Sequence, residues 1–167
     1  MSRHFSPYPR FSLLLGFALS RYSLSAEAAT FTVTNLNDSD PGSLRQAIFD
    51  ANTAAGDDII VFQSGLIGTI TLTSGEIVIS DNLTINGPGA NILEVSGNHT
   101  SRVFFIRSAT VVINGLKIKN GLATFDIGGK AHGGGIYNES GILTINNSIL
   151  SGNSASREDG GAIYNEA

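Results

Sequence analysis

The sequence has 167 residues, of which 41% are hydrophobic and only 14% charged, and this length suits a single domain or part of one. A net charge of -4 and scattered basic residues without a basic stripe exclude nucleic acid as the expected partner. The absence of Cys excludes disulfides and thiolate metal sites.

The N-terminal segment has the three parts of a secretory signal peptide. Two arginines precede the short apolar run Phe11–Leu19, and the small-x-small pattern AEA follows at Ala26–Ala28. The apolar run is about half the ~20 residues that a membrane-spanning helix needs. We interpret residues 1–29 as a signal peptide cleaved near Ala28 or Ala29, the alternative being a disordered or misassigned N-terminus. We therefore expect an exported protein that is not an integral membrane helix protein.

Residues 30–58 are expected to form an N-terminal cap made of one strand and one helix. Thr30–Thr34 (TFTVT) alternates as a strand does. Ser43 and Gln46 fit a capping box, in which each side chain bonds the backbone N–H of the other residue. The helix is predicted over residues 43–53 and would cover the open end of the β array that follows. Its apolar face consists of Leu44, Ala47, Ile48 and Ala51.

The remainder of the chain is built from a repeat without helices. Three segments share an apolar-x-Ile-Asn core, and their central residues Ile85, Ile113 and Ile145 are 28 and 32 residues apart. The strings GGGIYN and GGAIYN add a spacing of 27 residues. Each core has a further short apolar segment before it and after it, so a unit has about three strands. The preceding segments are Glu76–Ser80, Val103–Arg107 and Gly135–Asn138, and the following ones are Ile92–Val95, Leu116–Gly121 and Ser148–Asn153.

A unit of this kind cannot bury its apolar side alone, and parallel stacking of successive units solves this problem. We therefore predict an all-β fold, a right-handed parallel β-helix (solenoid) of roughly four to five coils over residues 59–167, with a short N-terminal capping helix. A leucine-rich repeat needs leucine-dominated positions and a period of about 20–29 residues. An immunoglobulin-like sandwich would not need near-identical strands at regular spacing. The last unit stops early, so we expect the stack to continue beyond Ala167.

Stacking predicts which residues meet between coils. Ile85, Ile113 and Ile145 should form an interior ladder. Asn86, Asn114 and Asn146 should form a polar ladder at a turn, with like side chains bonding each other. The paired glycines Gly133-Gly134 and Gly160-Gly161 are expected to allow positive φ angles where the coil bends.

Two stretches resemble known exported bacterial β-helix proteins. PGSLRQAIFDAN (Pro41–Asn52) resembles their CSLREA-type N-terminal segment, with Gly42 in place of the cysteine and Gln46 in place of the glutamate. The GGGI and GGAI motifs resemble the GGA-[ILV] repeat of chlamydial polymorphic outer membrane proteins, although leucine replaces phenylalanine in the paired F-x-x-N motif. The resemblance implies surface-exposed or secreted passengers, some implicated in adhesion. Their wider pectin-lyase-like superfamily also contains polysaccharide lyases and hydrolases.

The candidates for metal chemistry are few. Asp38 and Asp40 flank one serine and are candidate oxygen ligands for Ca²⁺, with turn and capping roles as the alternative. The Asp57-Asp58 pair is interpreted as a turn before a strand. His99 and His132 lie about one coil apart, which allows stacking or, less simply, a metal pair. No other cofactor is expected.

The candidates for ligand contact lie on the repeats. Tyr137 and Tyr164 occupy equivalent places in the two IYN copies, as a sugar-stacking platform or as a purely structural aromatic ladder. Lys117 and Lys119 alternate with apolar residues and face outward, as an acidic-glycan contact or as a solvated face. Glu158 and Asp159, beside Arg157, are interpreted as a solvated loop.

These observations favour a non-enzymatic exported β-helix protein on the cell surface, the outer membrane or outside the cell. Its role would be adhesin-like or cell-envelope interaction, and its expected partners are surface glycans or host and envelope components. The first alternative is a carbohydrate-active enzyme, a polysaccharide lyase or hydrolase, and the second is a structural spacer. The sequence shows no catalytic motif that decides for an enzyme.

Overall fold

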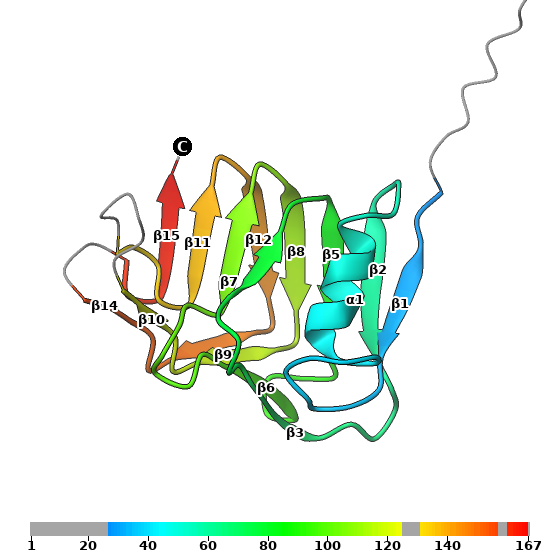
Figure 1. Ribbon diagram of the computed structural model, residues 1–167, viewed down its shortest axis with the longest axis horizontal. Helices are drawn as coiled ribbons and strands as arrows, with labels where there is room; N and C mark the ends of the chain where they lie inside the picture. The colour runs from blue at the N-terminus through cyan, green and yellow to red at the C-terminus, as the bar shows by residue number, and fades with distance from the viewer. Residues whose placement is uncertain (1–26, 125–130, 157–159, 167) are drawn as a thin grey trace, which may run out of the picture.

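The structure of the protein is a computed structural model, which describes residues 27–124, 131–156 and 160–166. Within these residues the chain forms fifteen short strands and one helix. The strands stack into parallel sheets that run along one axis (Figure 1). The fold is a parallel β-helix of about five turns, as the repeat predicts.

Three main sheets form the sides of the β-helix, and each takes one strand from successive turns. The five-stranded sheet has the order β1 (Thr30–Val33), β2 (Asp58–Phe62), β5 (Leu83–Asn86), β8 (Thr110–Asn114), β12 (Ile142–Asn146). The second sheet has the order β3 (Gly68–Thr71), β6 (Leu93–Ser96), β9 (Lys117–Lys119), β13 (Ile149–Ser151). The third has the order β4 (Ile77–Ile79), β7 (Phe104–Arg107), β11 (Ile136–Glu139), β15 (Ile163–Glu166). A two-stranded sheet pairs β10 (Leu122–Ala123) with β14 (Ser154–Ala155).

The predicted ladders form in the predicted register. Ile85 pairs with Ile113, and Ile113 pairs with Ile145, inside the five-stranded sheet. Asn114 Nδ2 donates to Asn86 Oδ1 at 2.8 Å, and Asn146 Nδ2 donates to Asn114 Oδ1 at 2.9 Å. The amide ladder therefore ties three consecutive turns together at one corner.

The helix α1 (Leu44–Ala51) lies inside the predicted range and covers the first turn of the stack (Figure 1). The four predicted apolar residues of the helix are all buried. At its C-terminal end, Asn52 Nδ2 donates to the carbonyl of Val78, and Asn52 Oδ1 accepts from the N–H of Ser80. The Asn52 side chain thus bonds backbone groups at the free edge of β4, where a further strand would otherwise pair.

The capping box forms only in half. Ser43 Oγ accepts from the N–H of Gln46 at 3.1 Å, as predicted. The prediction of the return bond from Gln46 to the N–H of Ser43 was wrong, because the Gln46 side chain donates to Asp50 one turn further along the helix. The N–H of Ser43 is instead satisfied by the carbonyl of Asp40 in the preceding turn.

The paired glycines divide two roles between them. The first glycine of each pair takes the positive φ angle, +62° at Gly133 and +78° at Gly160. Gly134 has no positive φ, but a Cβ there would lie 2.1 Å from the carbonyl oxygen of Ser154 in the next turn. The predicted positive φ is therefore confirmed at Gly133 and Gly160 but not at Gly134 and Gly161, and Gly134 serves the close approach of two coils.

Candidate functional site

One hollow in the described surface lies where the chain passes from the β3–β6–β9–β13 sheet to the β4–β7–β11–β15 sheet. It is centred on Arg102, which precedes β7. The side chain of Arg102 is only 8% exposed. An Arg is buried to this extent only when its donors are satisfied, so its contacts define the site.

Three kinds of partner hold the Arg102 guanidinium. Nη1 donates to Glu76 Oε2 at 2.5 Å, and this pair links two neighbouring turns. Nε donates to the carbonyl oxygens of His132 and Gly133, both at 3.1 Å. The guanidinium carbon lies 5.0 Å from the centre of the Tyr137 ring, which is a cation–π distance. Arg102 is therefore held by Glu76 of the preceding turn and by His132, Gly133 and Tyr137 of the following turn.

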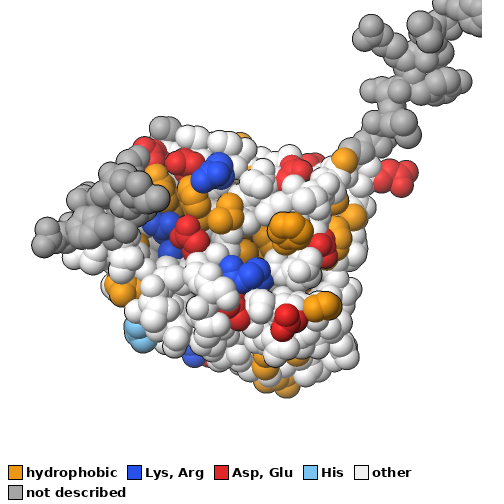
Figure 2. Space-filling model, in the orientation of Figure 1, with side chains coloured by type: hydrophobic (Ala, Val, Ile, Leu, Met, Phe, Trp, Pro, Cys, Tyr) orange, Lys and Arg blue, Asp and Glu red, His pale blue; other side chains and the backbone are white. Residues whose placement is uncertain are grey.

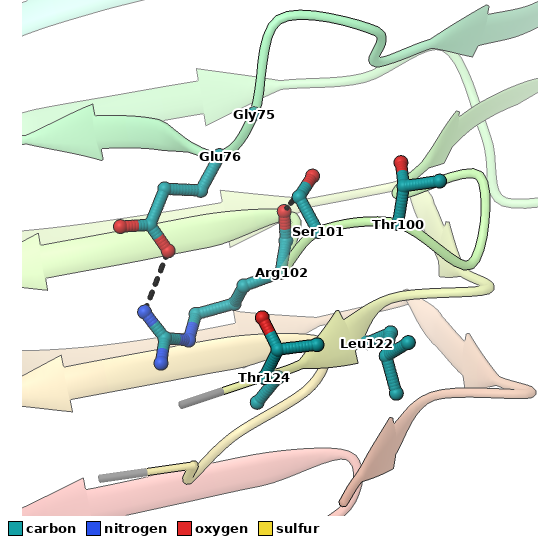
Figure 3. A pocket seen from close by; sticks show the side chains of 8 residues that line it. Gly75, Glu76, Thr100, Ser101, Arg102, Leu122 and Thr124 are labelled. Carbon is teal, nitrogen blue, oxygen red and sulfur yellow. Dashed lines mark hydrogen bonds and ion pairs between the residues drawn. The ribbon is translucent and has the colours of Figure 1, made fainter. Parts of the chain in front are cut away.

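A cavity of about 290 Å³ opens beside this ion pair. Figure 3 shows Glu76 and Arg102 pointing toward each other, with the hydroxyl-bearing side chains of Thr100, Ser101 and Thr124 near them. Apolar surface comes from β10. We call this group the Arg102 site, and its side chains are Glu76, Thr100, Ser101, Arg102, Leu122, Ala123 and Thr124.

The site is concave and combines donors, acceptors and apolar surface, as small-molecule sites do. Its volume is at the lower end of the range for such sites, about 300–1,000 Å³. A guanidinium and a carboxylate side by side can donate to and accept from neighbouring hydroxyl groups of one ligand.

Aromatic rings from successive turns support the site from the third sheet. Phe105 stacks on Tyr137 with ring centres 5.2 Å apart, and Tyr137 meets Tyr164 edge to face at 5.6 Å. His132 stacks on Tyr164 at 4.0 Å. Tyr137 is only 3% exposed and lies under Arg102. The geometry thus favours the structural ladder for Tyr137, while Tyr164 in the last described turn is half-buried.

The two lysines proposed for glycan contact meet a carboxylate instead. Lys117 Nζ lies 2.9 Å from Glu94 Oε1, and Lys119 Nζ donates to Glu94 Oε2. Thr69 Oγ1 also donates to Glu94, at 2.8 Å. Glu94 is on β6 and the lysines are on the adjacent β9, so stacking pairs both lysines with a single carboxylate.

These contacts change the proton affinity of Glu94. Hydrogen bonds from Lys119, then Lys117 and Thr69, lower the pKa of Glu94 to about 2, since each stabilises the ionised carboxylate. On the face shown in Figure 2, basic side chains lie next to acidic ones, and hydrophobic side chains are exposed in small groups.

The Ca²⁺ candidates do not converge on an open site. Asp38 Oδ1 accepts from Arg45 Nη2 at 2.7 Å, and Oδ2 accepts from the backbone and hydroxyl groups of Thr73 and Ser74. Burial raises the pKa of Asp38, but hydrogen bonds from Ser74, Arg45 and Thr73 outweigh it and hold that pKa well below its ordinary range. Asp40 is exposed in a turn with φ of 79°. Arg45 thus occupies the place beside Asp38 that a cation would need.

The other candidates have separate places. His132 packs on Tyr164, whereas His99 is exposed in the turn after β6. Asp57 is exposed and accepts from Asn82, while Asp58 is buried at the start of β2. Residues 157–159, with Glu158 and Asp159, lie outside the described residues. In the described part of the chain, no three His, Asp or Glu side chains gather as a metal-binding group.

Sequence reasoning missed Arg102 and Glu76, which form the centre of the site. A signal was present, because each charged residue stands just before a buried strand, and β4 and β7 are equivalent strands of neighbouring turns. Only the register of those strands shows that the two charges meet.

The described residues include no helix with the length and apolar character needed to cross a membrane. No protein-family model, curated protein or solved structure matches this chain.

Proposed function

We propose that this protein is a non-enzymatic, exported β-helix protein that binds a glycan of the cell surface or envelope at the Arg102 site. The observation that carries the proposal is the cavity of about 290 Å³ beside the Glu76–Arg102 pair. A sugar ring offers adjacent hydroxyl groups and an apolar C–H face. The site offers an acceptor and a donor side by side with apolar surface from Leu122 and Ala123.

The pairing of the carboxylates with cationic side chains supports glycan binding over glycan hydrolysis. Glycoside hydrolysis generally needs two carboxyl groups across the scissile bond. Glu76 is the one carboxylate among the described residues that line the cavity, and it is paired with Arg102. Glu94 and Asp38, on other parts of the surface, are also engaged by cationic side chains. These groups hold the coils together and are poorly placed to transfer protons to a substrate.

A glycan array tests the proposal with two matched variants. Thr124 is exposed at the rim, so Thr124→Trp should fill the cavity and reduce binding at least about tenfold while the fold is retained. Thr144→Trp makes the same change at an exposed position on β12 and should leave binding unchanged.

Failure of the parent protein to bind any glycan would contradict the proposal, and so would equal binding by both variants. The same preparations are incubated with pectate and alginate, with and without Ca²⁺. Formation of shortened products would favour the carbohydrate-active enzyme instead.

A further inference from the structure

Asp58 is a buried carboxylate whose second oxygen has no partner. The residue begins β2 and is 1% exposed. Its Oδ1 accepts from the backbone N–H of Ala29 at 2.8 Å. Its Oδ2 is buried, and no hydrogen bond reaches it within the described residues. A buried carboxylate with one neutral donor is costly, because the charge has lost its water and gained little in return.

The backbone of Ala29 is held firmly in this position. The N–H of Ile59 donates to the carbonyl of Ala29 at 2.8 Å, and the β1–β2 pairing begins at the next residue, Thr30. Gly56 packs so closely that a Cβ there would lie 2.9 Å from the carbonyl oxygen of Glu27. The contacts of Ala29 and Thr30 with β2 lie in the part of the chain that cleavage would retain, so they still hold the nitrogen of Ala29 beside Asp58, whereas the Glu27 contact would be lost.

The sequence places a cleavage motif at this same nitrogen. In the small-x-small pattern Ala26-Glu27-Ala28, the bond to be cut is the one between Ala28 and Ala29. We propose that a signal peptidase hydrolyses this bond and that the new α-ammonium group of Ala29 forms a buried ion pair with Asp58. The inference rests on the exported character in the proposed function and is independent of glycan binding.

The chemistry of the step is a simple hydrolysis. Water adds across the peptide bond, so that Ala28 leaves with the new carboxylate and the nitrogen of Ala29 becomes an ammonium group. The ammonium keeps the present N–H donor to Oδ1 and adds two further N–H groups and a positive charge, which can reach Oδ2. A charge-assisted bond of this kind is roughly twice as strong as a neutral one.

The geometry also selects the cleavage position. Cutting one residue later would remove Ala29 and leave Asp58 buried without its observed donor. Cutting earlier would leave Glu27 and Ala28, which are exposed, as a short tail and keep Ala29 a neutral amide. Of the two positions that the sequence allows, near Ala28 or Ala29, only the Ala28–Ala29 bond yields the ion pair.

The first test maps the N-terminus of the exported protein. The full chain is expressed in a bacterium with its own leader, and the product outside the cytoplasm is analysed by mass spectrometry. We expect a chain that begins at Ala29. A chain that begins elsewhere, or one that stays uncut, overturns the proposal.

The second test compares how one substitution, Asp58→Asn, changes the melting temperature of two forms of the protein. The cut form is the exported protein, and the uncut form is the full chain translated in vitro without membranes. In the uncut form Asp58→Asn removes an unpaired buried charge, so the melting temperature should stay the same or rise. In the cut form it breaks an ion pair, and the melting temperature should fall by about 5–10 °C.

Asp57→Asn is the matched control, since Asp57 is the exposed neighbour of Asp58 and its carboxylate accepts a hydrogen bond from the Asn82 side chain. It should change the melting temperature of the two forms equally and by little. An equal effect of Asp58→Asn on both forms would show that Asp58 has no ion pair with Ala29. Glycan binding is measured on the same samples, so loss of the proposed glycan function is seen separately.

Discussion

At the scale of single residues, the notable feature is that opposite charges on different turns pair with each other. Glu94 holds both Lys117 and Lys119, and Glu76 holds Arg102. Parallel stacking brings equivalent positions of neighbouring turns to about 4.8 Å, so opposite charges at nearly equivalent positions must meet. The lysines that the sequence suggests as ligand contacts are therefore already engaged in ion pairs within the fold.

The Glu94 cluster, formed by Glu94, Lys117, Lys119 and Thr69, should make the stability of the protein depend on pH in the acid range. The pKa of Glu94 is about 2 in the folded protein, below the ordinary Glu value of about 4.3. A lowered pKa means that its stabilisation is fully present above about pH 4.3 and is lost as the pH falls toward about 2. Glu94→Gln should therefore lower the urea midpoint at pH 7, and the difference should shrink between about pH 4 and pH 2.

Glu139→Gln is the control for this prediction. Glu139 lies 3.5 Å from Arg107, but both side chains are more exposed, at 39% and 59%. Exposed pairs of this kind contribute little, so the urea midpoint should barely move at either pH. Equal midpoints for Glu94→Gln and the parent at pH 7 would show that the cluster adds nothing to stability.

At the scale of elements, the corners decide how closely the turns approach. A positive φ at Gly133 bends the chain, and the missing Cβ of Gly134 lets the carbonyl of Ser154 come close from the next turn. In the first copy of the motif the two glycines thus serve the bend and the close approach, whereas in the second copy the structure shows the bend at Gly160 and no equally close approach at Gly161. The strand after the bend then enters the third sheet in register, with Tyr137 beside Tyr164.

The two second glycines should respond differently to the same substitution. At Gly134 a new Cβ would lie 2.1 Å from the Ser154 oxygen, whereas at Gly161 the nearest atom is 3.2 Å away. Gly134→Ala should reduce the free energy of unfolding by about 3 kcal/mol, and Gly161→Ala by less than about 1 kcal/mol. Chemical denaturation followed by circular dichroism measures both. A larger loss for Gly161→Ala would mean that the close contact at Gly134 is relieved at no cost.

At the scale of the whole molecule, burial falls along the axis of the β-helix. Ile85 and Ile113 are fully buried, while Ile145, at the next level of the same ladder, is only partly buried. A solenoid gains stability from contacts between neighbouring turns, so a residue with a turn on each side contributes most. The helix α1 covers one end of this stack.

This decrease in burial along the axis predicts that replacing Ile by Ala will destabilise the protein by different amounts in two neighbouring turns. Ile113→Ala should lower the free energy of unfolding by about 3–4 kcal/mol, because it opens a cavity inside the packed core. Ile145→Ala should lower it by about 1–2 kcal/mol, since the side chain is already partly in contact with water. Urea denaturation of both variants provides the comparison. Equal losses would mean that the ladder is uniformly packed along the axis.

The fold was largely predictable from the sequence, although some elements were not. The predicted apolar segments all contain strands, but β3 at Gly68–Thr71 was not predicted, because GTIT carries only one buried apolar residue. The expected return bond of Gln46 was wrong, because Asp50 competes for the same side chain. The bounds of strands also differ by one or two residues where Gly and Asn form the turns.

What the sequence by itself determined is the β-helix, its capping helix and the register of its ladders. The spacing of Ile85, Ile113 and Ile145 is periodic, and a period in the sequence becomes a stack in space. Only the tertiary structure decided the contacts of Arg102 with Glu76 and of Asp58 with Ala29. Each of these contacts joins groups on neighbouring turns. The loops between strands differ in length from turn to turn, so the repeat spacing in the sequence does not predict which of these groups meet.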